Sequence, residues 1–218
     1  RGDSLCDPLR MYERLLVAQP DVVYHLAAHA NVRASARDSG LVFETNTRGT
    51  FNLLEAMREA GGTKRIIFAS SCSVYGEPIS FPSGEYDSPM PVQTSLYGAS
   101  KIAGEALCQA YDHHYGFKSV IMRLVSQLGP GQTRGHLPDL FGKLTREPHR
   151  LIVMGNGQQL RSYMHVADCV SALVHVGLGE HLGIYNVSNQ HPWTVVQSIE
   201  CLCEELKLVT GRHTEVYR

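Results

Sequence analysis

Short apolar segments alternate with amphipathic segments along most of this 218-residue chain. The apolar segments, which we expect to form buried strands, span residues 21–28, 65–71, 119–124 and 184–188. The amphipathic segments, which we expect to form helices, span residues 41–61, 96–115 and 167–178. Apolar strands that are connected by helices predict a parallel sheet with both of its faces covered. We therefore expect an α/β fold.

Ligands of such folds bind beyond the carboxyl ends of the parallel strands. In this chain, those ends are Ala27–Ala28, Ser70–Ser71 and the loop that follows Leu124. We expect all three to open onto one crevice.

Composition excludes several classes of function. The formal net charge is −1 and the chain has no long basic run, which argues against binding to nucleic acid or to a membrane surface. No stretch approaches 18 apolar residues, and the first residues do not resemble a signal peptide. The six cysteines form no CxxC pair and the eleven histidines form no HExxH motif, so we expect reduced thiols, no metal site and a cytoplasmic protein.

The segment TSLYGASK places Tyr97 and Lys101 four residues apart on a predicted helix. Positions i and i+4 are neighbours on a helix, so the Lys101 ammonium is expected to stabilise the phenolate of Tyr97 and lower its pKa. Such a tyrosine can remove a proton from an alcohol while a hydride leaves the same carbon. Ser71 or Ser70, at a strand end, would supply a second hydroxyl. Taken alone, Y-x-x-x-K is a weak signal, since it also occurs on exposed helix faces.

Several further motifs occur in the same order. They are DVVYHLAA, ETNTRGTFNLLEA, FASSCSVYGEP, YGASKIAGE, GPGQ and LRSYMHVADCV. In this order and spacing the chain resembles the extended short-chain dehydrogenase/reductases, and within them the NAD-dependent epimerase/dehydratase family. It is most similar to members of the UDP-glucose 4-epimerase type. The resemblance implies a Rossmann-like doubly wound parallel sheet, with an NAD-binding portion over residues 1–125 and a mixed substrate-binding portion with a returning strand and helix over 126–218.

The resemblance also implies roles for individual residues. Tyr97 would be the general base, Lys101 its partner and a ligand of the nicotinamide ribose, and Ser71 a hydrogen-bond donor to the reacting oxygen. The expected cofactor-binding residues are Asp3, Ala27, Ala28, Asn46, Ser70, Tyr97 and Lys101. The expected substrate-binding residues are Ser71, Ser73, Ser126 and Arg161, the last for the diphosphate. Other roles stay open: Ser70 can satisfy backbone groups at a strand end, Asn46 can be a helix-side hydrogen bond, and Arg161 can be a solvated strand residue.

The chain departs from the family pattern in several places, among them Leu96, which stands where proline is common. It contains no G-x-x-G-x-x-G loop, the motif that holds the pyrophosphate at a helix N-terminus, so we expect an N-terminally truncated form with weakened NAD binding. Ser126 stands where asparagine is usual, and Ser162 stands where aspartate is common, which leaves the sugar and the nucleotide open. Ser73 stands where dehydratases and decarboxylases of the family carry an acid. A hydroxyl cannot serve as that acid.

These observations predict an NAD-dependent nucleotide-sugar epimerase, with a homodimer as the expected assembly. A nucleotide-sugar 4-keto reductase is the alternative enzyme. The alternative that is not an enzyme is a truncated homologue without catalytic activity.

Overall fold

The computed structural model describes residues 4–31, 37–78, 80–87, 92–153, 155–211 and 214–217. Asp3, which was expected to meet the adenine end of a cofactor, lies outside these residues. The chain divides into two compact units. The first contains Arg1–Leu124 and Val170–Val187, and the second contains Val125–Cys169 and Ser188–Arg218. The functional assignment of the portions 1–125 and 126–218 stays a prediction.

A four-stranded parallel sheet forms the centre of the first unit, which confirms the predicted Rossmann-like α/β fold. The order is β1 (Val22–His25), β2 (Arg65–Ser71), β3 (Lys118–Leu124) and β8 (Gly183–Val187). Ser71 pairs in register with Leu124, so the carboxyl ends of β2 and β3 lie level. Because β1 ends at His25, the alanines at 27 and 28 follow the strand.

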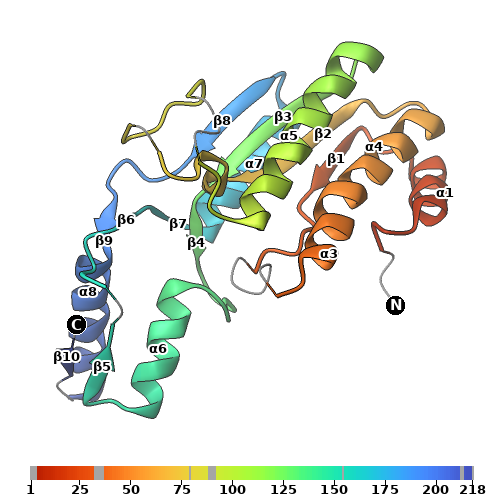
Figure 1. Ribbon diagram of the computed structural model, residues 1–218. Coiled ribbons are helices and arrows are strands. Elements are labelled where there is room, and N and C mark those ends of the chain that lie inside the picture. Colours follow the sequence, from red (N-terminus) through yellow and green to blue (C-terminus); the bar gives the residue numbers. More distant parts are fainter. Residues whose placement is uncertain are drawn as a thin grey trace. The chain divides into compact units, whose positions relative to one another are not determined.

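Helices cover both faces of this sheet, with α4 and α5 on one side and α7 on the other (Figure 1). The helical segments are α1 (Pro8–Ala18), α3 (Ser39–Val42), the π-helical turn η1 (Phe43–Arg48), α4 (Gly49–Ala60), the 3₁₀ turn η2 (Cys72–Tyr75), α5 (Leu96–Tyr115) and α7 (Val166–Leu178). The sequence predicted one helix over 41–61. The structure makes it three consecutive segments, with the π turn in the middle.

Local signals define the ends of α5, the helix that carries Tyr97 and Lys101. Its N-cap Ser95 accepts a hydrogen bond from Gly98 N at 3.0 Å. Its C-cap Gly116 adopts a left-handed conformation at φ 69°, which glycine tolerates without strain.

Helix α1 was missing from the sequence analysis, although Asp7 and Pro8 are a good start signal: the Asp7 side chain caps Arg10 N at 3.1 Å.

An apolar core lies between the sheet and the helices α4 and α5. Its buried members are Leu53, Leu54, Met57, Ile66, Phe68, Cys108, Tyr111, Phe117 and Ile121. They come from α4, α5, β2, β3 and the loop between α5 and β3, so their burial fixes α5 against β2 and β3. Full burial of each large apolar side chain contributes about 1.5–3 kcal/mol.

Arg65 at the start of β2 holds the end of α7 on the sheet. Its Nη2 donates to Val176 O at 2.6 Å and to His181 O at 3.0 Å, and its Nε donates to Gly177 O at 3.2 Å. The last carbonyls of a helix lack intrahelical partners and carry partial negative charge, so a guanidinium is well suited to this position.

The second unit contains short strand pairs and two helices. The pairs are β4 (Ser126–Leu128) with β7 (Tyr163–His165), β5 (Arg150–Ile152) with β10 (Glu215–Tyr217), and β6 (Leu160–Arg161) with β9 (Trp193–Thr194). The helices are α6 (His136–Arg146) and α8 (Val195–Thr210). Thr194 and Gln197 form a capping box at the start of α8. Within the described ranges, no helix has the length and apolar character that crossing a membrane requires.

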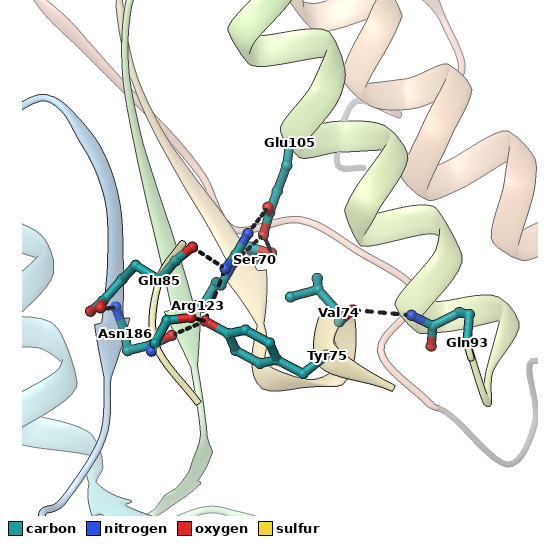
Figure 2. Close-up of polar contacts among 9 residues, drawn as sticks. Ser70, Val74, Tyr75, Glu85, Gln93, Glu105, Arg123 and Asn186 are labelled. Carbon is teal, nitrogen blue, oxygen red and sulfur yellow. Dashed lines mark hydrogen bonds and ion pairs between the residues drawn. The ribbon is translucent and has the colours of Figure 1, made fainter. Parts of the chain in front are cut away.

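A buried ion pair joins α5 to β3 in the first unit. Arg123 and Glu105 are 2% and 3% exposed, and they form two hydrogen bonds, Nε to Oε1 at 3.0 Å and Nη2 to Oε2 at 2.7 Å. Arg123 Nη1 also donates to the Tyr75 hydroxyl at 2.9 Å and to Glu85 O at 3.0 Å, and Ser70 donates to Glu105 (Figure 2). The pair and its hydrogen-bond partners therefore connect five segments of the first unit, which are β2, η2, the loop at Glu85, α5 and β3.

We expect Glu105→Gln to lower the free energy of unfolding by about 3 kcal/mol, because it leaves a buried guanidinium without a countercharge. Denaturant unfolding at neutral pH measures this change. Glu59→Gln is the matched control, since Glu59 forms an exposed ion pair with Arg58 and should change the free energy by less than about 0.5 kcal/mol. Equal effects of the two variants would contradict the assignment.

Candidate functional site

The carboxyl end of β2 and the first turns of α5 bring three of the expected catalytic residues together. Ser71 ends β2, and Tyr97 and Lys101 lie on the first turns of α5. The hydroxyl of Ser71 interacts with the phenol of Tyr97 and acts to lower its pKa. Lys101 Nζ lies 5.8 Å from the centre of the Tyr97 ring. Two hydroxyls and one ammonium are thus grouped where a parallel sheet binds its ligands.

Lys101 is buried, at 3% exposure, which is unusual for an ammonium group. Its Nζ donates to Ala69 O at 2.6 Å and lies 4.9 Å from the centre of the Phe68 ring. Burial lowers the pKa of Lys101 to about 8, although Cys108 and Glu105 act in the opposite direction. The ammonium form therefore still dominates at neutral pH, and a carbonyl and an aromatic face hold it in place.

The pKa of Tyr97 differs from the sequence prediction, which expected Lys101 to lower it. Burial of the half-buried phenol raises the pKa above its ordinary value of 10, and the hydrogen bond with Ser71 opposes this only in part. The prediction was wrong in direction because helical spacing reports the presence of a cation and says nothing of the desolvation of the phenol. At neutral pH, Tyr97 is a phenol that can donate a proton.

Ser71 and Ser73 lie at the junction of β2 and η2. Ser71 Oγ caps the turn by accepting from Ser73 N at 3.2 Å, and it also lies 3.2 Å from Ser73 Oγ. Both side chains are half-buried. The structure therefore places the two serines beside each other, with no carboxylate at position 73.

Asn46, which was expected to line the cofactor, holds the backbone of the site. Its Oδ1 accepts from His29 N at 2.7 Å, and its Nδ2 donates to His29 O at 3.2 Å and to Ser100 Oγ at 2.9 Å. Ser100 in turn donates to the carbonyl of Tyr97 at 2.7 Å. Asn46 thus ties the segment after β1 to the start of α5, while contact with a cofactor stays a prediction.

A buried histidine supports the π turn that carries Asn46. Thr50 Oγ1 donates to Asn46 O at 2.6 Å and lies 2.8 Å from His25 Nε2. Because the Thr50 proton is already donated, His25 Nε2 is the donor of the second bond. Burial and then the charge of Lys101 lower the pKa of His25 from its ordinary 6.5 to about 4. His25 is therefore neutral in the folded protein.

This lowered pKa predicts a loss of stability in acid. Above pH 6.5, His25 is neutral in both the folded and the unfolded state and contributes no pH dependence. Between pH 6.5 and 4, the unfolded state binds a proton that the folded state does not, so the free energy of unfolding should fall by about 3 kcal/mol.

Urea unfolding at pH 7 and at pH 4.5 tests this loss. His25→Gln keeps a donor near the position of Nε2 but does not titrate, so its stability should fall less than that of the wild type. His114→Gln, at an exposed position of α5, is the control and should keep the full wild-type pH dependence. A His25→Gln variant with unchanged pH dependence would refute the assignment.

The residues around Tyr97 fit the nicotinamide end of a dinucleotide. Small side chains, Ala27 and Ala28, follow β1 at the carboxyl edge of the sheet. His29 Nδ1 is buried and has no hydrogen-bond partner among the residues that the structure describes. The ammonium of Lys101 carries three N–H donors and can also donate to a ribose hydroxyl. These polar groups suit a sugar and an amide better than an apolar ligand.

The remaining expected residues lie elsewhere. The hydroxyl of Ser70 is buried and donates to the carboxylate of Glu105, a side chain of α5, and not to the backbone groups that the alternative role named. Ser126 is exposed on β4, and Arg161 is exposed on β6, both in the second unit. Their roles in substrate binding stay predictions.

Several residues of the site were absent from the list of expected site residues. Glu105 lies eight residues after Tyr97 on α5, so its place on the same helical face was readable from the spacing. The hydroxyl of Tyr75 lies 2.8 Å from Asn186 Oδ1 and 3.0 Å from Gly84 O. Glu85 accepts a hydrogen bond from Asn186 N at 2.9 Å. Gln93 carried no sequence signal and bonds Val74 O at 3.3 Å (Figure 2).

The chain is similar to known proteins over most of its length. Residues 4–188 match the family model described as the NAD dependent epimerase/dehydratase family. UDP-glucose 4-epimerase from Mycolicibacterium smegmatis is 32% identical over 73% of this chain and 51% of its own length. The dTDP-D-glucose 4,6-dehydratase of Mus musculus is 32% identical over 95% of this chain and 58% of its own length.

Solved structures give the same result. Thermus thermophilus UDP-glucose 4-epimerase in complex with NAD superposes with a TM-score of 0.84 at 30% identity, over 99% of this chain and 70% of that one. A structure of MoeE5 with UDP-glucose and NAD superposes with a TM-score of 0.83 at 27% identity, over 100% of this chain and 71% of that one. The chain spans about half the length of the curated relatives described above.

Proposed function

Since the chain belongs to the NAD-dependent epimerase/dehydratase family, we propose that it acts in the inversion of a hydroxyl-bearing carbon of a nucleotide sugar. The observation that carries the proposal is the grouping of Ser71, Tyr97 and Lys101 at the carboxyl end of β2. The relatives named UDP-glucose 4-epimerase support a nucleotide sugar as the substrate class. A homodimeric assembly and a cytoplasmic location remain predictions.

Each residue has one task in this reaction. The chemistry that NAD supplies when bound is the acceptance and return of a hydride at a carbon. Tyr97 exchanges the proton of the reacting hydroxyl, taking it as the alcohol is oxidised and giving it back as the carbonyl is reduced. Ser71 donates a hydrogen bond to the same oxygen. The ammonium of Lys101 stabilises the phenolate form of Tyr97 and can bind a ribose hydroxyl.

Ser73 favours epimerisation or reduction over dehydration. A dehydratase of this family needs an acid at this place for proton transfer at the neighbouring carbon, and a serine hydroxyl cannot provide it. Ser73 Oγ lies 3.2 Å from Ser71 Oγ, so a hydroxyl occupies the position next to Ser71. Dehydratases occur among the relatives, which makes the distinction one for experiment.

The alternative enzyme, a nucleotide-sugar 4-keto reductase, has one observation in its favour. Burial raises the pKa of Tyr97, with the hydrogen bond to Ser71 acting against it, and a phenol that is protonated at neutral pH suits proton donation to a keto oxygen. An epimerase uses the same donation in its second half-reaction. The raised pKa therefore supports the reductive step in both enzymes.

Incubation with NAD and UDP-glucose, UDP-N-acetylglucosamine or dTDP-glucose, followed by NMR of the products, tests the proposal. We expect a 4-epimer from at least one of these substrates and no 4-keto-6-deoxy sugar from any of them. In a parallel incubation with NADH and a nucleotide-linked 4-keto-sugar, reduction of the keto group, without any epimerisation in the first incubation, would select the reductase. Accumulation of a 4-keto-6-deoxy product would refute the argument from Ser73.

We expect Tyr97→Phe to lower kcat by about a thousandfold, since positioned acid–base groups contribute 10²- to 10⁴-fold. The dissociation constant for NAD, measured by titration of the variant and of the wild type, should be unchanged. Tyr86→Phe is the control, because Tyr86 is 99% exposed, and it should keep wild-type activity. Near-normal turnover of Tyr97→Phe would rule out its role in proton transfer.

A further inference from the structure

We propose that Gln93 is a positioning residue whose side-chain amide sets the spacing between the turn that carries Ser71 and the helix that carries Tyr97. The inference rests on the proposed function, because this spacing matters for activity only if the two hydroxyls act on one oxygen atom. Gln93 itself is assigned no contact with substrate or cofactor. It acts through the two segments that it joins.

The two ends of the Gln93 amide bind different segments. Its Nε2 donates to Val74 O in η2 at 3.3 Å (Figure 2). Its Oε1 accepts from Thr94 N at 3.1 Å and from Ser95 N at 3.4 Å. Ser95 is the N-cap of α5, so one side chain bridges the turn after β2 and the start of the catalytic helix.

Packing at Gly98 shows how closely the two segments approach each other. A Cβ atom at Gly98 would lie 2.3 Å from Gln93 Oε1 and 2.6 Å from Ser73 O, which is too close for any side chain. Gly98 N also donates to Ser95 Oγ at 3.0 Å. Helix α5 therefore starts in direct contact with η2, and the Gln93 amide lies in that contact.

The turn η2 is also anchored away from α5. Its far end is held by Tyr75, whose hydroxyl accepts from Arg123 Nη1 at 2.9 Å. Val74 O is the carbonyl that Gln93 binds, and it lies three residues after Ser71 in one short turn. A shift of this turn would move Ser71 relative to Tyr97. Misplacement of a catalytic group by about 1 Å can cost about a hundredfold in rate.

The variant Gln93→Glu tests whether Gln93 acts by capping the start of α5 or by joining α5 to η2. A carboxylate keeps the acceptor for Thr94 N and Ser95 N, and negative charge at the start of a helix is favourable. It cannot donate to Val74 O. We expect the Tm to be unchanged or higher, KM for the nucleotide sugar to stay within about twofold, and kcat to fall about tenfold. A wild-type kcat in Gln93→Glu would overturn the proposal, because capping alone would then explain Gln93.

A second measurement does not depend on turnover. The ¹³Cζ resonance of Tyr97, assigned by its loss in Tyr97→Phe, reports the interaction with Ser71. Gln93→Met keeps the size of the side chain and removes both polar ends, so it should shift this resonance in the direction that Ser71→Ala does. Gln109→Met, at an exposed position of α5, is the control and should leave the resonance unchanged.

The kinetic and NMR measurements together separate a failure of the inference about Gln93 from a failure of the proposed function. A wild-type ¹³Cζ shift in Gln93→Met would overturn the inference, and so would a resonance that Ser71→Ala leaves unmoved. A wild type that turns over none of the nucleotide sugars, combined with the expected shift in Gln93→Met, would support the positioning role and count only against the proposed function.

Discussion

The first unit depends on the buried pair of Arg123 and Glu105. Two charges at 2% and 3% exposure are tolerable only if their hydrogen-bonding capacity is met by the protein. The two hydrogen bonds of the pair hold α5 against β3. Arg123 also donates to the Tyr75 hydroxyl of η2 and to the carbonyl of Glu85 in the following loop. Asn186 extends the network to β8 by binding Glu85 and Ser83. The apolar core stabilises these segments, and the ion pair selects how they align.

The catalytic geometry follows from this alignment. Tyr97, Lys101 and Glu105 recur every four residues on α5, so one helical face presents a phenol, an ammonium and a carboxylate in sequence along the sheet. The carboxylate of this face, Glu105, is buried and is held by its two hydrogen bonds from Arg123. Ser70 donates to Glu105, while Ser71, the next residue, interacts with Tyr97. Adjacent serines thus have separate tasks, as the alternation of side chains at a strand end allows.

The start of α5 is also held by hydrogen bonds from η1. The π turn η1 buries Asn46, and the Asn46 amide joins the backbone of His29 to Ser100 and so to the carbonyl of Tyr97. Thr50 donates to the carbonyl of Asn46, and neutral His25 in turn donates to the Thr50 hydroxyl. The start of α5 is therefore held by side chains from η1 and by the Gln93 amide beside η2. π turns are often found at functional sites, and here the turn carries the residue that holds the backbone around Tyr97.

The sequence by itself determined the parallel α/β fold, the limits of β2 and α5, and the grouping of Tyr97 with Lys101, because periodicity, caps and i,i+4 spacing are local properties. The tertiary structure alone decided the pairing of Glu105 with Arg123, the π turn around Asn46 and the bridging position of Gln93. It also decided the direction of the pKa of Tyr97, which desolvation raises against the hydrogen bond from Ser71. Burial and contacts between distant segments exist only once the chain has folded, and no local pattern encodes them.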